Sequence, residues 1–405
     1  MMGSQLGTYA EILMGQSPAG ETCNATGVGV PLLNGPTEFG RDHPTARQFT
    51  VDGVRFARPG DLLFCVRGST TGKMNWADRD YAIGRGVAAI RHKSDPARQP
   101  LVRAVIEHGL PGLLQQATGS TFPNVSAKQI ASLPWPSLGS EQEREVARLV
   151  SLIDDLINAN ELACEDAENL VGALYRAHMA SAASVERVVL KSVAAFTKGV
   201  AYKSSDLQPS SAALVSLKAL RRTGGYQRVG LKPFTGPHKP DQVVRATDSV
   251  VAQTDLTQGA EVVGRAIRIG GDADFTKLVA SMDACIVRPS SDRVSPELLF
   301  ALLSSEDFRQ HCRAQANGTT VLHLPLNAVQ SFAFELPDRQ TAQMLTEVIR
   351  PLWKLDDALA AETETLKASR STIRQRLLSG DIRIRLTSAD NAMNIARVAV
   401  AEGEA

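Results

Sequence analysis

The sequence has few of the features that mark a membrane, secreted or metal-binding protein. No stretch approaches the roughly 18 uncharged apolar residues of a membrane span, and the opening residues lack a cationic start followed by an apolar core. The five cysteines form no CxxC pair and no cluster with the seven histidines, so neither a disulfide framework nor a zinc site is supported. We therefore expect a cytoplasmic chain with free thiols, no membrane contact and no metal.

The sequence also has almost no net charge. Its 44 Lys and Arg residues nearly equal its 43 Asp and Glu residues, for a formal net charge of +1. A strongly basic chain is the usual sign of a nucleic-acid partner, and the total gives no such sign. The hydrophobic content of 43% excludes wholesale disorder, and the length of 405 residues suggests two or three domains.

Motifs of catalysis and cofactor binding are missing too. Residues 68–74, GSTTGKM, resemble a phosphate-binding loop, but the loop is one residue short and Met74 stands where a hydroxyl should bind Mg²⁺. Residues 84–89 fit a loose dinucleotide fingerprint, but HKSDP follows and breaks the helix that would hold the pyrophosphate. No GxSxG, HExxH or Asn/Asp-Pro-Pro-aromatic motif occurs. We expect no catalytic residue in this chain, and no methylation by it.

What the sequence does contain is a weak internal repeat. Three segments of the first half match three of the second in the same order, and the spacing between partners grows along the chain, as loop insertions would produce. The matches are Gly15 with Gly199; Arg58, Asp61 and Gly72 with Arg245, Asp248 and Gly259; and GST at 119–121, with Ile130 and Ser132, against GTT at 318–320, with Val329 and Ser331. This pattern predicts a duplicated fold.

Each half ends in a stretch with an apolar residue every three or four positions. This heptad spacing favours a coiled coil, and the alternative is an amphipathic helix lying on a globular core. The two stretches differ in charge, the first acidic and the second basic, which favours pairing with each other. Polar Asn160 and Glu362 on the seams could fix the register. The predicted seam residues are Leu149, Ile153, Leu156, Leu170, Leu174, Leu352, Leu355, Leu359, Leu366 and Ile373.

The remaining segments have short apolar runs of strand length broken by Gly, Pro, Ser and Asn, which predicts mixed α/β domains. The expected architecture has two globular domains of similar fold, separated by two long antiparallel coiled-coil helices, in a pseudo-twofold repeat. The predicted bounds are 1–138 for the first domain, 139–184 for the first helix, 185–338 for the second domain, 339–382 for the second helix and 383–405 for a loose tail.

The distribution of charge is more informative than its total. Both globular segments are net basic, so the near-neutral sum reflects internal cancellation. Within them, basic residues cluster among Gly, Asn, Gln, Ser and aromatic residues, which suits loops that bind DNA phosphates and base edges; a solvated face is the alternative. The candidate DNA-binding residues are Arg41, Arg47, Arg67 and Lys73 in the first segment and Lys203, Arg221, Arg222 and Arg228 in the second.

Two α/β domains, each followed by a heptad helix, with PGDLLFCVRGSTTG at 59–72 and IRQRLLSGDIRI at 373–384, resemble the specificity subunit of type I restriction-modification systems. The resemblance covers nearly the whole chain. It implies that each domain is a target-recognition domain for half of a split site in double-stranded DNA. It also implies that the helices set the gap and dock two methyltransferase subunits and, through them, restriction/translocase subunits.

The resemblance places the chemistry in those partners, which would use S-adenosylmethionine, ATP and Mg²⁺, and it implies no cofactor in this chain. The second copy departs from the first, with Thr247 in place of Gly60 and TDLTQ in place of the GST turn that follows Arg67 at 68–70, so individual contacts cannot be transferred between copies. Two alternatives stay open: a stand-alone DNA-binding or regulatory coiled-coil protein, and an enzyme with an unrecognised site.

Overall fold

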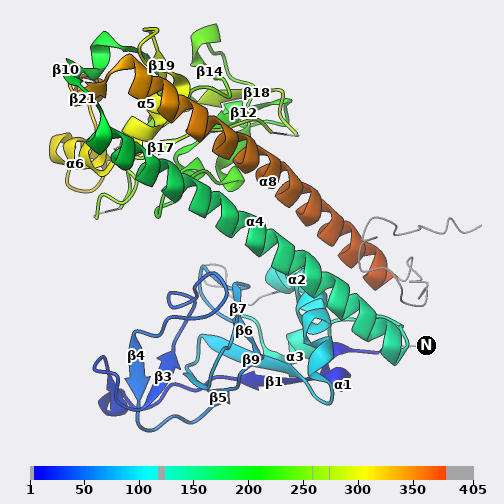
Figure 1. Ribbon diagram of the computed structural model, residues 1–405. Helices are drawn as coiled ribbons and strands as arrows, with labels where there is room; N and C mark the ends of the chain where they lie inside the picture. Colours follow the sequence, from blue (N-terminus) through cyan, green and yellow to red (C-terminus); the bar gives the residue numbers. More distant parts are fainter. Residues whose placement is uncertain (1–3, 117–123, 258, 273, 380–405) are drawn as a thin grey trace, which may run out of the picture. The chain divides into compact units, whose positions relative to one another are not determined.

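The computed structural model describes residues 4–116, 124–257, 259–272 and 274–379 (Figure 1). The chain divides into two compact units: unit 1 is Met1–Ile157 with Thr365–Ala405, and unit 2 is Asn158–Glu364. The predicted loose tail, 383–405, and the GST turn at 119–121 lie outside the described residues.

Beside its portions of the two long helices, the described part of unit 1 contains two sheets and three short or medium helices. The first sheet has the order β1-β9-β6-β7 with antiparallel neighbours, and the second has the order β2-β4-β3-β8-β5, in which β3 and β8 are parallel. The strands of the first sheet are β1 (Ala10–Met14), β6 (Leu62–Cys65), β7 (Met74–Trp76) and β9 (Val87–His92). Those of the second are β2 (Cys23–Asn24), β3 (Val30–Leu33), β4 (Gln48–Thr50), β5 (Phe56–Ala57) and β8 (Tyr81–Ile83). The helices are α1 (Leu6–Tyr9), α2 (Gln99–Gln116) and α3 (Ala127–Ala131).

Unit 2 repeats this plan. Its first sheet has the order β11-β19-β15-β17 and its second the order β13-β12-β18-β14, in which β12 and β18 are parallel. These strands are β11 (Ala194–Lys198), β12 (Ala212–Val215), β13 (Leu231–Pro233), β14 (Val243–Val244), β15 (Ser249–Ala252), β17 (Ala266–Ile267), β18 (Lys277–Ala280) and β19 (Ala284–Pro289). Two further pairs join β10 (Val185–Val189) to β21 (Ala333–Pro337), and β16 (Thr254–Asp255) to β20 (Leu322–His323). The helices are α5 (Pro296–Leu303), α6 (Glu306–Gln315) and α7 (Leu326–Gln330).

A buried ion pair occupies the same place in both units and shows why the matched residues recur. Asp61 at the start of β6 accepts a hydrogen bond from the Arg58 amide and binds Arg91 of β9 at 2.7 Å. Asp248 at the start of β15 accepts from the Arg245 amide and binds Arg288 of β19, also at 2.7 Å. With the matching strand orders, this confirms the predicted duplication of fold.

Glycine positions refine the repeat. The amide of Gly15 donates to the carbonyl of Val87, as that of Gly199 does to Ala284, and a Cβ at either glycine would lie 2.2 or 1.9 Å from a backbone oxygen. The predicted match of Gly72 with Gly259 is wrong. The counterpart of Gly72 is Gly264, because both have positive φ, and each ends the hairpin loop by donating to the last residue of its first strand. The loop of unit 2 is longer, which displaced the alignment.

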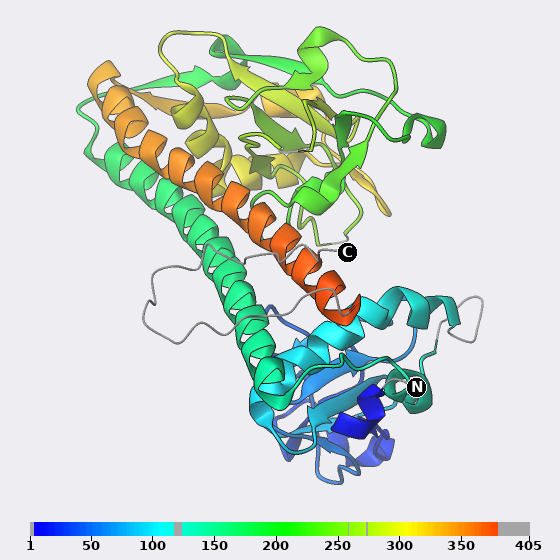
Figure 2. The same cartoon turned by 90° about the vertical axis from the view of Figure 1, so that its right-hand side faces the viewer.

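The long helices are α4 (Ser140–Ser181) and α8 (Arg339–Ser379), and they run antiparallel in each unit. In unit 2, Asn160 donates to Glu362 at 3.1 Å, so the two polar seam residues bind each other, and Cys164 contacts the Asp356 carbonyl. In unit 1, Asp154 binds Arg370 at 2.7 Å. Figure 2 shows α2 beside the first turns of α4.

The helices pack against globular cores as well as against each other. Val146 and Val150 of α4 belong to the core of unit 1, and Val171 and Ile349 belong to that of unit 2, so the amphipathic-helix alternative describes the helix ends. The predicted seam residue Ile153 is buried. Ile157 and Val171 are buried as well, although the heptad pattern predicts their neighbours Leu156 and Leu170 for the seam.

Two predicted seam residues are therefore corrected. Leu170 and Leu355 are 45% and 48% exposed. In each helix the next residue, Val171 or Asp356, lies on the inward face instead of the predicted leucine. The other predicted seam residues are half-buried, namely Leu149, Leu156, Leu174, Leu352, Leu359, Leu366 and Ile373.

Candidate nucleic-acid interface

Five of the predicted DNA-binding residues lie in equivalent connections of the two units. Arg41 and Arg47 occupy the connection between β3 and β4, and Arg221, Arg222 and Arg228 occupy that between β12 and β13. These strands correspond in the repeat, so the two basic clusters that the sequence showed separately fall at one structural position. Lys203 lies elsewhere, in the β11–β12 connection, with its side chain exposed.

In unit 1 the structure gathers three predicted residues at one edge. Arg67 and Lys73 flank the turn of the β6–β7 hairpin, and both side chains are exposed, with no ion pair among the described residues. The loop containing Arg41 is held against β7, because Asn75 donates to the Gly40 carbonyl at 2.8 Å and the Trp76 amide donates to the Asp42 carbonyl at 3.2 Å. We call Arg41, Arg67 and Lys73 the hairpin edge of unit 1.

In unit 2 two predicted residues are engaged within the chain. Arg221 binds Glu165 of α4 at 2.7 Å and donates to the Tyr226 carbonyl. Arg228 binds Asp272 at 2.6 Å and also pairs with Asp274 and Glu364, and its hydrogen bond to Asp272 raises the pKa of the guanidinium. These ion pairs fasten the β12–β13 connection to the two long helices.

Arg222 differs from its neighbour. Its side chain is 72% exposed and lies 3.5 Å from Glu261. A surface ion pair of this kind leaves the guanidinium accessible to a second anion.

Sequence reasoning missed three arginines beside Arg222. Arg265, Arg309 and Arg313 converge on the backbone of the loop between β16 and β17. A signal was available for two of them, because Arg309 and Arg313 are four residues apart in a helix and therefore share a face.

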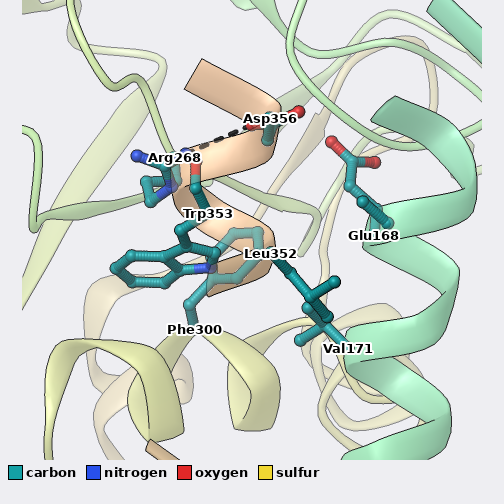
Figure 3. A pocket seen from close by; sticks show the side chains of 8 residues that line it. Glu168, Val171, Arg268, Phe300, Leu352, Trp353 and Asp356 are labelled. Carbon is teal, nitrogen blue, oxygen red and sulfur yellow. Dashed lines mark hydrogen bonds and ion pairs between the residues drawn. The ribbon is translucent and has the colours of Figure 1, made fainter. Parts of the chain in front are cut away.

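A pocket of unit 2 lies where α4 and α8 meet the second core (Figure 3). Arg268 is buried there and binds Asp356 and Asp357 of α8. The central carbon of its guanidinium, Cζ, lies 4.6 Å from the centre of the Trp353 ring. Burial raises the pKa of Glu168 on α4 to about 7, against the lowering effect of Arg221. The rest of the lining is apolar, so the pocket lies where both long helices pack against the core of unit 2.

Metal clusters and membrane-spanning helices were sought among the residues that the structure describes. Within them, no group of three or more His, Cys, Asp or Glu side chains could hold a metal ion. None of the helices that the structure describes is long and apolar enough to cross a bilayer.

The duplicated α/β fold with paired long helices is also found in a solved structure. A crystal structure of the type I restriction-modification system S subunit from M. genitalium has this fold, with a TM-score of 0.54 and 12% sequence identity over 92% of this chain and 94% of that one. No family model matches the chain.

Curated relatives agree in sequence. The putative type I restriction enzyme MjaX specificity subunit of Methanocaldococcus jannaschii is 31% identical over 149 residues, and the type I restriction enzyme HindI specificity subunit of Haemophilus influenzae is 28% identical over 95 residues. These alignments cover 37% and 23% of this chain, and 35% and 20% of the relatives. The resemblance to type I restriction-modification specificity subunits that the sequence indicated is confirmed.

Proposed function

We propose that the chain is the DNA sequence-specificity subunit of a type I restriction-modification complex. Each unit reads one half of a bipartite, asymmetric site in double-stranded DNA. The observation that carries the proposal is the presence, in one chain, of two copies of one fold whose corresponding loops carry different side chains. Two unlike readers suit two unlike half-sites, much as paired recognition elements set half-site spacing in dimeric DNA-binding proteins.

The reaction itself belongs to partner subunits under this proposal. Two methyltransferase subunits would use S-adenosylmethionine to methylate adenine at N6, and restriction/translocase subunits would use ATP and Mg²⁺. The chain would supply recognition and assembly, as a cytoplasmic and non-catalytic subunit.

The outer face of α8 supports a docking role. Met344 and Leu355 are 47% and 48% exposed, and Val348, Pro351 and Ala358 are exposed on the same side of the helix. A row of apolar side chains at intervals of three, four and seven residues fits the surface of a partner protein better than water.

The test is to express the chain with the methyltransferase encoded beside it and to sequence the DNA for methylated adenines. We expect a split motif with two specified parts and an unread gap. Replacing Arg67 and Lys73 by Gln should reduce methylation at that motif at least tenfold, because exposed cations at the hairpin edge would lose their DNA contacts.

Lys128→Gln is the matched control, since Lys128 is an exposed cation of the same unit on α3. Methylation without a split motif would contradict the proposal. Tight binding of a single undivided site by the chain alone would instead favour a stand-alone DNA-binding or regulatory protein.

A further inference from the structure

Three guanidinium groups of unit 2 meet at two backbone carbonyls. Arg265 donates to the Glu261 oxygen at 2.7 Å, Arg309 donates to the same oxygen at 2.8 Å, and Arg313 donates to the Ala260 oxygen at 3.1 Å. We call these three residues the arginine cluster. Among the described residues, no carboxylate lies within ion-pair distance of any of them, so neutral oxygens are their acceptors. Positive charge is concentrated here without a bound counter-charge.

The carboxylates that face the cluster are committed elsewhere or held at a distance. The fully buried Asp255 accepts hydrogen bonds from Thr257 and from the amides of Val262 and Val263. Glu261 lies beside Arg222, and Glu306 stands at the start of α6 without an ion pair to the cluster. Burial, together with Arg309 and Arg313, lowers the pKa of Arg265 to about 10. Arg265 therefore stays protonated near neutral pH, although the positive charges of Arg309 and Arg313 repel it.

The loop between β16 and β17 is shaped to keep the cluster together. Ala260 has φ of 51°, a left-handed conformation that is costly for a residue with a Cβ. Gly264, with φ of 74°, lies so close to α6 that a Cβ there would come within 2.4 Å of the Cys312 Cβ. These two backbone features place the loop carbonyls against the arginine-bearing face of α6.

The repeat gives this cluster a counterpart in unit 1. Gly264 corresponds to Gly72, and just as Gly264 lies against α6, Gly72 lies against Leu110 of α2. Gly72 ends the hairpin loop that carries the exposed Arg67 and Lys73. Each unit thus presents positive charge at the corresponding edge of its own fold, from the hairpin loop in unit 1 and largely from α6 in unit 2.

We propose that the arginine cluster of Arg265, Arg309 and Arg313 binds a phosphate group of the DNA backbone. This inference rests on the proposed function and assigns unit 2 a DNA-facing edge whose three arginines are not among the DNA-binding residues predicted from the sequence. Guanidinium groups suit the site because their fixed donors match phosphate oxygens and they stay charged when partly buried. Arg222, which is exposed and lies 3.5 Å from Glu261, is placed to add a further contact.

The test measures DNA binding by the chain in complex with its methyltransferase, using one duplex with the methylated motif and one without it. Replacing Arg309 and Arg313 by Gln should weaken binding to both duplexes about tenfold or more. It should also lower the slope of log affinity against log salt concentration by about 1, since roughly 0.9 is lost for each phosphate contact.

Arg293→Gln with Arg339→Gln is the matched control, because these two arginines of unit 2 pair with Glu186 and Asp292 on the surface. Equal affinity and equal salt slope for the two double variants would overturn the inference. A loss confined to the duplex with the motif would also overturn it, since that result indicates base reading.

Two further variants keep the test valid if the Gln variant folds poorly. Glu261→Gln retains every guanidinium and removes a facing carboxylate, so it should tighten binding about two- to fivefold. Replacing Arg309 and Arg313 by Lys keeps the charge and should restore most of the affinity. Unchanged binding in Glu261→Gln would count against the site. Failure of the proposed function would be visible separately, as the absence of a split methylated motif with the unaltered chain.

Discussion

The two units share a topology but differ in how they use charge at their corresponding edges. In unit 1 the hairpin loop carries Arg67 and Lys73, both exposed. In unit 2 the corresponding loop is longer and carries the buried Asp255 and Arg265, and the other two arginines of the cluster, Arg309 and Arg313, come from α6. The buried contacts of the fold are thus repeated, whereas the exposed loops are not. This is the division that a protein needs if one scaffold is to recognise two different sequences.

The long helices are also attached to the rest of each unit by different chemistry. In unit 1, burial alone would raise the pKa of Glu107, but Arg103, Arg370 and Arg374 together hold it below the ordinary value. In unit 2, burial raises the pKa of Glu168 against the lowering effect of Arg221, and the nearby Asp356 and Glu165 raise it further. One attachment favours an ionised carboxylate and the other a protonated one.

The largest effect is expected from removing the aspartate of each buried Asp–Arg pair, and comparing the two variants tests whether the pairs are equivalent. Asp61→Ala leaves Arg91 without its buried partner, and Asp248→Ala does the same to Arg288, so each should destabilise its own unit by about 3 to 5 kcal/mol. Hydrogen exchange read by mass spectrometry can follow peptides of β9 and β19 separately. The exposed Asp52 and Asp292 are the matched controls, one in each unit, and substituting them by Ala should change little.

An unequal response would break the comparison. If Asp248→Ala loosened β19 but Asp61→Ala left β9 protected, the second sheet alone would depend on the pair. The repeat would then be one of topology without shared energetics.

A pH titration sharpens the contrast between the helix attachments. The pKa of Glu168 in the folded state is raised from 4.5 to about 7, so its contribution to stability is complete below pH 4.5 and is lost as pH rises through 7. Unit 2 should therefore lose on the order of 1 to 3 kcal/mol between pH 5 and pH 8. The contribution of Glu107 has the opposite sign and is lost as pH falls below its ordinary range.

Glu168→Gln should remove most of the loss in unit 2, as followed by hydrogen exchange of its peptides corrected for the intrinsic rate at each pH. Asp166→Asn, an exposed acid on the same helix, should leave the profile unchanged. A profile that is flat from pH 5 to pH 8 in the unaltered chain would show that Glu168 ionises freely in the folded state.

The repeat could be predicted from the sequence because the matching residues occupy buried positions where the geometry allows few other side chains. Asp61 and Asp248 recur because each binds a buried arginine, and Gly15 and Gly199 recur because a Cβ would collide with a backbone oxygen. Heptad spacing identified the helices but misplaced Leu170, since two adjacent apolar positions satisfy a 3.5-residue period almost equally well. Arg265 could not be found at all, because its role depends on α6 meeting a loop nearly fifty residues away in the chain.

The smallest expected effect separates two neighbouring arginines that the sequence treated as one pair. Arg221→Gln removes a half-buried bridge to Glu165 and a hydrogen bond to Tyr226, so it should destabilise unit 2 by about 1 kcal/mol. Arg222→Gln removes only an exposed pair and should change stability by less than about 0.5 kcal/mol, while lowering DNA affinity several-fold. Denaturant titration and a DNA-binding assay on the same two variants should therefore rank them in opposite orders. The same ranking in both assays would mean that the β12–β13 connection acts as a single element, in which anchoring to α4 and contact with DNA cannot be assigned to different side chains.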